Sequence, residues 1–250
     1  VGIVFSCTKA ATAICAHILV DRGELELQAP VSKYWPEFAK AGKEKTTVQM
    51  MLNHESGIPA LREPVKEKGF LDWDYMVKRM EDEPAWWEPG TRNGYHMLNF
   101  GWTVGELVRR VSGKSLGQFF ADEVAGPTGA NFWIGLPDGV EPHIADILPY
   151  TPQKGDPVSD FARMLVSDPN SIQALGFANN GGWGANDEDA HRAEIGAAGG
   201  ISNARGQVAI YTPLAVNDGS IVSRDRVEAM SMVATATQRD ATLLVPTRFA

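Results

Sequence analysis

The sequence predicts an α+β fold that is rich in helices and has few strands. Residues 1–5, VGIVF, are short, apolar and rich in Val and Ile, which is typical of a buried strand. Residues 7–20 then form a helix with no polar face, and a helix that is apolar on all sides lies at the centre of a fold. Only a few later segments have strand character, so we expect a small sheet beside many helices.

Start and stop signals locate the remaining helices. Thr46 and Gln49 have the spacing of a capping box, in which two side chains bond reciprocally to the first backbone N–H groups of a helix. In the block LNFGWTVGELVRRVSG the apolar residues recur at helical spacing, and Gly113 ends that helix. The helix after it ends at Gly126-Pro127. The expected helices cover residues 7–20, 46–56, 72–82, 98–112, 115–124, 203–216 and 224–234.

Strand candidates are few, and one long stretch has no regular pattern. Residues 176–200 are rich in Gly, Asn and Asp, which disfavours regular structure and predicts a long loop. Long loops inside compact domains are often functional. The expected strands cover residues 1–5, 131–135, 143–148, 219–222 and 242–246.

The composition argues against several classes of function. At 250 residues the chain can bury a sizeable core, and 44% of its residues are hydrophobic. A formal net charge of -8 argues against nucleic acid and an anionic membrane as partners, because both bind basic surfaces. No apolar run is long enough to span a bilayer, and no signal peptide is evident. We therefore expect a cytoplasmic protein, unless a targeting segment lies upstream of this chain.

The two cysteines do not predict a disulfide. If Cys7 and Cys15 lie on one helix, their Cα atoms are about 12 Å apart. A disulfide requires less than about 7 Å. We expect both cysteines to be small buried residues.

The S-x-x-K motif of Ser6 and Lys9 is the first candidate for chemistry. Residues i and i+3 share a helix face, so the Lys9 amine can reach the Ser6 hydroxyl. The helix N-terminus favours the alkoxide of Ser6, and the helix dipole and desolvation both lower the pKa of an ammonium placed there. A neutral Lys9 can act as a base toward Ser6. The motif is short enough to occur by chance, so a capping serine beside a lysine that reaches into solvent is the alternative.

Tyr95 is the second candidate. It follows a Pro-Gly turn and precedes a helix, in EPGTRNGYHMLNFGW, where its hydroxyl can point into a cleft. Near two ammonium groups its pKa of about 10 would fall. The alternative is a half-buried tyrosine whose hydroxyl is already hydrogen bonded.

No metal or cofactor site is expected. His54 and Glu55 lack a second histidine at the spacing of an H-E-x-x-H zinc motif, because Ile58 occupies that position. The glycine-rich segments match neither a dinucleotide-binding motif nor a P-loop. No G-x-S-x-G motif occurs, which argues against an ordinary α/β-hydrolase.

Four segments of the chain resemble one known superfamily in both content and order. They are FSCTKA, LNHESGIP, EPGTRNGYHMLNFGWTVGELVRRVSGKSLGQFF and AAGGISNARG. Together they look like the serine β-lactamase/penicillin-binding superfamily, and most closely its class C-related family VIII carboxylesterases. The resemblance implies a single catalytic domain over residues 1–250 with a β-lactamase/transpeptidase-like fold. An antiparallel sheet, formed by parts 1–34 and 131–250, would be flanked by helices and interrupted by a helical subdomain at roughly residues 35–130.

The resemblance also implies roles for single residues. Ser6 would be the acylated nucleophile, and Lys9 its proton partner. Tyr95 would occupy the tyrosine position of a Y-x-N element and assist as general base and acid. The backbone N–H of Ser6 would form half of the oxyanion hole, and His96 is expected to bind substrate. No K-T-G or H-x-G element follows residue 200. In the family such a strand supplies the second oxyanion donor, so we expect terminal strands to be missing at both ends.

The expected function is hydrolysis of small, short-acyl esters through an acyl-enzyme on Ser6. Met97 stands where penicillin-hydrolysing relatives usually have Asn, which disfavours strong lactamase activity. The alternative enzyme is a β-lactamase or a D-Ala-D-Ala-type peptidase. The alternative of another class is a non-catalytic scaffold or an inactive fragment. The expected partner is a small-molecule ester or amide, and the sequence makes no prediction of oligomeric state.

Overall fold

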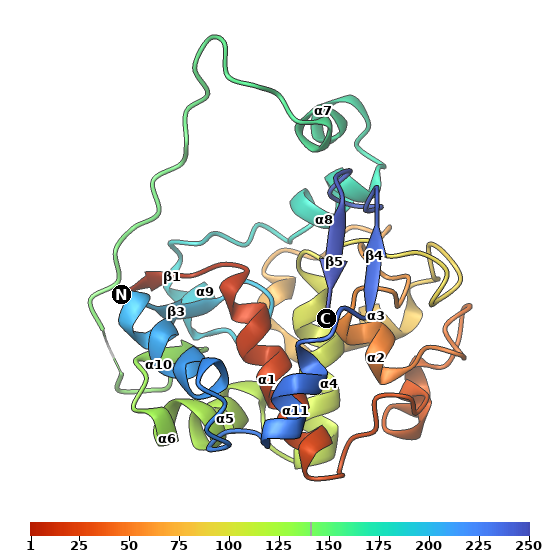
Figure 1. The fold of residues 1–250 in the computed structure, drawn as a ribbon. Helices are drawn as coiled ribbons and strands as arrows, with labels where there is room; N and C mark the ends of the chain where they lie inside the picture. The colour runs from red at the N-terminus through yellow and green to blue at the C-terminus, as the bar shows by residue number, and fades with distance from the viewer. Residues whose placement is uncertain (141) are drawn as a thin grey trace.

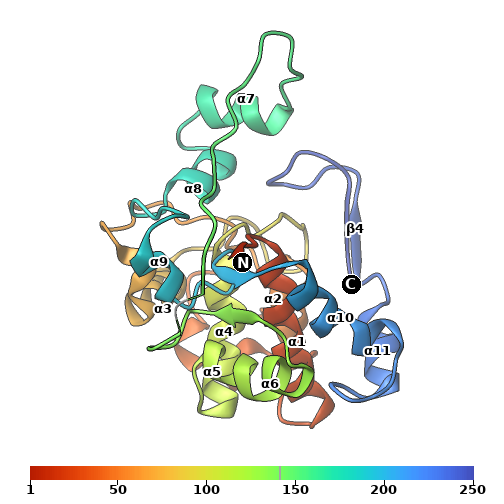
Figure 2. The ribbon, with the colours of Figure 1, turned by 90° about the vertical axis from the view of Figure 1, so that its left-hand side faces the viewer.

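The computed structural model describes residues 1–140 and 142–250. Helices surround the central helix α1 (Cys7–Asp21), and a small sheet lies near the N-terminus, beside the start of α1 (Figure 1). A long excursion that carries α7 (Asp160–Ser167) projects from this body in both views (Figures 1 and 2). The other α-helices are α2 (Val48–Leu52), α3 (Trp73–Asp82), α4 (Asn99–Ser112), α5 (Leu116–Phe120), α6 (Gly126–Thr128), α8 (Ile172–Ala178), α9 (Glu188–Arg192), α10 (Ala204–Ala215) and α11 (Arg224–Met230).

The main sheet has three short antiparallel strands, and the predicted antiparallel sheet is confirmed. Strand β3 (Gly200–Ser202) is central, between β1 (Gly2–Ile3) and β2 (Phe132–Ile134). A second sheet is the hairpin of β4 (Thr235–Thr237) and β5 (Thr247–Phe249). The predicted strands at 1–5 and 131–135 are therefore present but shorter than expected.

Three other strand predictions are wrong, because these segments form no ladder of backbone hydrogen bonds with a neighbouring strand. In 143–148, Ile144 and Ile147 pack against the Ile3–Ile201 cluster, but the segment is tied to its neighbours only at isolated points. In 219–222, Val222 is buried in the main core as part of the turn before α11. Residues 242–246 form the turn that joins β4 to β5.

Most predicted helices are confirmed, with differences at their ends. Helix α2 is capped by Thr47, whose hydroxyl accepts from the Met50 N–H at 3.3 Å, so the predicted Thr46 capping box is wrong by one residue. The helix predicted to stop at Gly126 continues through a π-helical turn (Ala121–Ala125) into α6. Proline is tolerated in the first helical turn, and the chain leaves the helix only at Gly129, whose φ is 64°.

The predicted loop at 176–200 is only partly irregular, and α7 and α8 were not predicted. Helix α9 and the first residue of β3 lie within this stretch, and α8 ends in it. Short 3-10 turns also occur at Val31–Lys33, Pro36–Phe38 and Gly69–Leu71.

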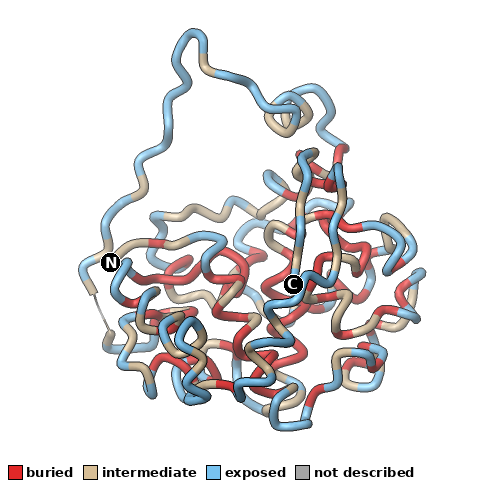
Figure 3. Tube along the Cα trace, in the orientation of Figure 1, coloured by how far each residue is buried: buried red, intermediate tan, exposed pale blue. Residues whose placement is uncertain are grey.

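Buried residues concentrate in the body around α1 and α4, whereas segment 142–170 is mostly exposed (Figure 3). One apolar cluster joins α1 to α4 and α5. Gly101 of α4 permits a very close approach, because a Cβ there would lie 2.5 Å from the Ala197 backbone nitrogen. This contact presses the chain just before β3 against α4. The division into a helical part at 35–130 and sheet-associated parts stays a prediction.

Two further findings concern the cysteines and the helix lengths. Cys15 is buried as expected, but Cys7 is exposed, because it faces outward at the start of α1.

Within the part of the chain that the structure describes, no helix combines the length and apolar character needed to cross a membrane.

Candidate active site

Ser6 lies in the sharp connection between β1 and α1. Phe5 before it has a φ of 43°, in the left-handed region that bulky residues rarely adopt, and such residues cluster at functional sites. The Ser6 side chain is exposed and makes no capping bond to α1, so a capping serine is excluded. Thr8 stabilises the turn instead: its hydroxyl donates to the Phe5 carbonyl at 2.6 Å and accepts from the Gly200 N–H at 2.9 Å.

Lys9 is buried directly behind Ser6. Its side chain is 6% exposed, and Nζ contacts the carbonyl oxygens of Met97 and Ala197 at 2.6 and 3.0 Å and Ser6 Oγ at 3.3 Å. These contacts exclude a lysine that reaches into solvent. Burial lowers the pKa of Lys9 from 10.5 to about 7.

The three contacts of Lys9 match the bonding capacity of a neutral amine. A neutral –NH2 group has two N–H donors and one lone pair. Because carbonyl oxygens can only accept, Met97 and Ala197 take both N–H bonds. In the neutral state the lone pair then faces the Ser6 hydroxyl and can accept from it, whereas in the ammonium state the third N–H of Lys9 donates to Ser6 Oγ. This geometry prepares Lys9 to take the proton of Ser6.

Tyr95 lies next to both groups. The Lys9 Nζ atom is 4.7 Å from the centre of the Tyr95 ring, which also packs against His54 and stacks on Phe249. Burial raises the pKa of Tyr95, and its side-chain hydrogen bond with Ser6 opposes that rise. The predicted fall in this pKa is therefore wrong, because burial outweighs the effect of the hydrogen bond with Ser6. Tyr95 stays protonated near neutral pH and can donate a hydrogen bond.

His96 is not placed to bind substrate. It is 1% exposed, and both ring nitrogens are occupied within the core. Nδ1 lies 2.6 Å from the Gly94 carbonyl oxygen, while Nε2 lies 2.9 Å from Ser56 Oγ and accepts from the Ile58 N–H. Burial lowers the pKa of His96 to about 4, so the ring is neutral. His96 shapes the tyrosine loop from inside, and we do not carry it forward as a substrate-binding residue.

The structure adds residues that the sequence analysis did not assign to the site. The sequence motif indicates His54 only as a possible metal ligand. In the structure its ring packs on Tyr95, and its Nδ1 accepts the backbone N–H of His96. Asp240 accepts the backbone N–H of Tyr95 at 3.0 Å. Asp favours turns because its side chain can accept a backbone N–H two residues further on, and this general preference is the signal that the sequence offers for Asp240. Its partner lies 145 residues away along the chain.

A free donor is available next to the nucleophile. Within residues 1–140 and 142–250, no acceptor lies in hydrogen-bond contact with the Ser6 backbone N–H, although its neighbours Cys7 and Thr8 are bonded within the turn. This N–H can stabilise negative charge on a carbonyl oxygen under attack by Ser6.

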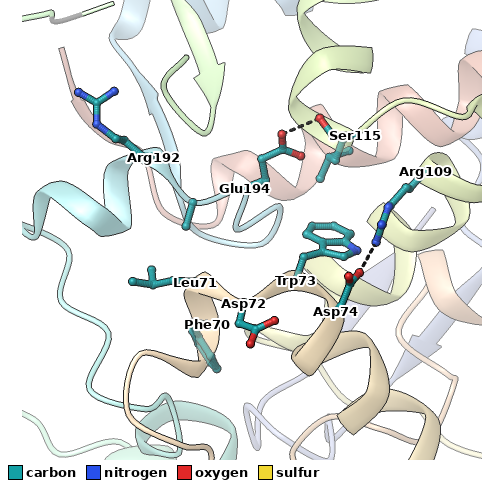
Figure 4. A pocket seen from close by; sticks show the side chains of 11 residues that line it. Phe70, Leu71, Asp72, Trp73, Asp74, Arg109, Ser115, Arg192 and Glu194 are labelled. Atoms are coloured by element: carbon teal, nitrogen blue, oxygen red, sulfur yellow. Dashed lines mark hydrogen bonds and ion pairs between the residues drawn. The ribbon is translucent and has the colours of Figure 1, made fainter. Parts of the chain in front are cut away.

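A separate cavity of about 600 Å³ lies elsewhere on the body (Figure 4). Neither Ser6 nor Tyr95 lines it, and charged groups on its wall are already paired. Arg109 bonds to Asp74 at 2.7 Å, and Glu194 accepts from Ser115 Oγ at 2.6 Å. Among the described residues, no group of three His, Cys, Asp or Glu side chains has the arrangement of a metal site.

Comparison with known proteins identifies the family. The family model described as Beta-lactamase matches residues 3–250. Esterase/beta-lactamase LipL of Mycobacterium tuberculosis is 31% identical over 98% of this chain and 59% of its own length. A crystal structure of a family VIII carboxylesterase is 33% identical with a TM-score of 0.86, over 99% of this chain and 65% of that one. A penicillin-binding protein homolog from Caulobacter crescentus is 28% identical with a TM-score of 0.82, over 99% and 64%.

The chain thus spans 59% to 65% of the length of these relatives. Its fold is β-lactamase/transpeptidase-like, as predicted. The predicted resemblance to the serine β-lactamase/penicillin-binding superfamily and its family VIII carboxylesterases is confirmed, and the chain belongs to the Beta-lactamase family.

Proposed function

We propose that this chain is a serine hydrolase that cleaves small, short-acyl esters through a covalent acyl-enzyme on Ser6. The observation that carries the proposal is the buried Lys9 amine, 3.3 Å from Ser6 Oγ and with a pKa of about 7. A lysine that is neutral near pH 7 can accept the serine proton and activate the oxygen as a nucleophile. The names of two relatives, an esterase/beta-lactamase and a family VIII carboxylesterase, support this reaction class.

In the acylation step, Ser6 Oγ attacks the ester carbonyl carbon and its proton passes to Lys9 Nζ. The Ser6 backbone N–H stabilises the negative charge that develops on the carbonyl oxygen. The carbon–oxygen bond to the alcohol then breaks, and the protonated Tyr95 donates its phenolic proton to the leaving alkoxide. Return of a proton from Lys9 to Tyr95 restores both groups. The products are the free alcohol and acyl-Ser6.

Deacylation uses Ser6 and Lys9 again. A water molecule attacks the acyl carbon while Lys9 takes one of its protons. The bond to Ser6 Oγ breaks, and the Lys9 ammonium returns that proton to the serine. The carboxylic acid leaves, and the enzyme is regenerated.

Cleavage of a β-lactam or of a D-Ala-D-Ala-type peptide is the second candidate, and the names of relatives support it. Met97 argues against it. The thioether of Met97 is only a weak acceptor and cannot donate, so it cannot replace the amide of an asparagine. We further infer a small-molecule ester or amide as the partner. We also infer a cytoplasmic location, which the two free thiols support.

Mass spectrometry after treatment with a serine-directed phosphonate tests the proposal. We expect a single adduct on Ser6 and loss of nitrophenyl ester hydrolysis in Ser6→Ala. Ser220→Ala, which changes an exposed serine of another turn, is the matched control and should keep parent activity. An adduct only at another serine, or equal activity of Ser6→Ala and parent, would refute the assignment. Faster turnover of a chromogenic cephalosporin than of the ester would favour the second candidate.

A further inference from the structure

Asp240 is a completely buried carboxylate in the turn between β4 and β5. Its side chain is 0% exposed, and all its bonding partners are donors. Oδ1 accepts the backbone N–H groups of Thr242 and Leu243, each at 2.8 Å, and Oδ2 accepts the Thr247 hydroxyl at 3.1 Å. Because a buried carboxylate is costly without such bonds, the turn is built around this group.

The same carboxylate reaches out of its own turn to Tyr95. The Tyr95 backbone N–H lies 3.0 Å from Oδ1 and 3.1 Å from Oδ2, so both oxygens share it. A hydrogen bond to a charged acceptor is roughly twice as strong as one between neutral groups. The peptide plane before Tyr95 is therefore fixed, and with it the direction in which the side chain leaves the backbone.

Further contacts hold the two segments together at short range. The Ala241 N–H donates to the Asn93 carbonyl at 3.1 Å. A Cβ at Gly94 would lie 2.8 Å from the Ala241 side chain, so only glycine allows the turn to approach this closely. On its other side the turn is held by Gln173 of α8, whose amide donates to the carbonyls of Ala241 and Thr242 at 2.8 and 2.9 Å.

We propose that Asp240 is a positioning residue that aims the Tyr95 hydroxyl at Ser6 by fixing the Tyr95 backbone. The kinetic consequence of this inference rests on the proposed function. Asparagine is an imperfect replacement, because it keeps one acceptor oxygen but loses the negative charge and places an NH2 group beside the Tyr95 N–H. We therefore expect the role to require the carboxylate.

The charge of Asp240 also acts on the phenol. Burial is the main cause that raises the pKa of Tyr95, and the negative charge of Asp240 adds to that rise. A nearby negative charge disfavours a phenolate and keeps the proton on Tyr95. Asp240 thus supports the protonated form that donates to Ser6 and to the leaving group.

Asp240→Asn with Gln173→Ala as the matched control tests the proposal kinetically. Both variants weaken the hydrogen bonding of the same turn, but only the first removes the charged acceptor that Tyr95 shares between two oxygens. We expect Asp240→Asn to lower kcat for a nitrophenyl ester by about 10- to 100-fold with KM within about threefold, as for a misplaced catalytic group. Gln173→Ala should keep kcat close to that of the parent. Parent-like kcat in Asp240→Asn, or an equal loss in both variants, would overturn the inference.

Two measurements do not depend on activity. The ionisation of Tyr95 can be followed by tyrosinate absorbance, with the signal of the matching Tyr95→Phe variant subtracted. Tyr95 should ionise at lower pH in Asp240→Asn than in the parent. In the unmutated protein with isotopically labelled tyrosine, the Tyr95 amide should exchange its hydrogen more slowly than the amide of the exposed Tyr150. An unchanged titration, or exchange as fast as that of Tyr150, would remove the structural basis of the inference.

The two proposals fail in distinguishable ways. An inactive parent whose Ser6 resists the phosphonate contradicts the proposed function, while titration and amide exchange still decide the link between Asp240 and Tyr95. An active parent with a parent-like Asp240→Asn contradicts only the link.

Discussion

Replacing Lys9 by arginine keeps the positive charge but removes the one group that can become neutral near pH 7. The guanidinium of arginine stays protonated in proteins. With a pKa of about 7, about half of the Lys9 side chains are neutral at pH 7. At the ordinary value of 10.5 only about one in three thousand would be neutral. At about 1.36 kcal/mol per pH unit, burial disfavours the ammonium by about 5 kcal/mol.

The measurement is kcat/KM for a short-chain nitrophenyl ester between about pH 5 and pH 9, because this parameter reports the pKa values of the free enzyme. We expect it to rise about tenfold per pH unit below pH 7 and to level off above, as Lys9 loses its proton. Lys9→Arg should lose at least about 10²-fold at pH 7. Lys45→Arg, the same change at an exposed lysine, should match the parent.

Two results would refute this reasoning. One is a rate that keeps rising beyond pH 9, because Lys9 would then keep its ordinary pKa. The other is parent-like activity of Lys9→Arg, because no neutral base would then be required at this position.

Three other changes probe the same site. Between pH 7 and 10.5 the buried Lys9 binds fewer protons in the folded chain than in the unfolded chain. The unfolding free energy of the parent minus that of Lys9→Met should therefore rise by about 1.4 kcal/mol per pH unit in this range. Urea unfolding at two pH values measures this difference, and no rise would contradict the prediction. Tyr95→Phe should lower kcat by about 10²-fold or more, and parent-like kcat would remove Tyr95 from the mechanism. His96→Ala should lower the unfolding free energy, measured by urea unfolding, by about 2–4 kcal/mol, because it leaves the Ser56 hydroxyl and the Ile58 N–H without their acceptor. A change in KM without a loss of stability would instead favour a role of His96 in substrate binding.

The central helix and the nucleophile could be predicted from the sequence because their signals are local. Residues 7–20 are apolar on every side, and Gly23 ends the helix with a φ of 74°. The spacing of Ser6 and Lys9 places them on one helix face, and the structure brings their side chains to 3.3 Å. Such features depend on neighbours within one helical turn.

The remaining parts of the site depend on contacts between distant segments. Strand β3 has only three residues, Gly200–Ser202, within a glycine-rich stretch, and it becomes a strand because β1 and β2 bond to both of its edges. The shift in the pKa of Tyr95 was predicted with the wrong sign, because the amount of burial is not visible in the sequence. Asp240 has the same limitation, since its function depends on a partner that the turn meets only after folding.

The burial of α1 connects the stability of the fold to its chemistry. An apolar helix at the centre of the core stabilises the protein, but it also withdraws water from any amine in its first turn. Water withdrawal disfavours the ammonium, and the carbonyls of Met97 and Ala197 then hold the neutral amine with its lone pair toward Ser6. Those two carbonyls come from segments far apart in the sequence, one just before α4 and one just before β3. The pKa of Lys9 is therefore set by tertiary packing, and changes that loosen the contact between α4 and the chain before β3 should raise it toward its ordinary value.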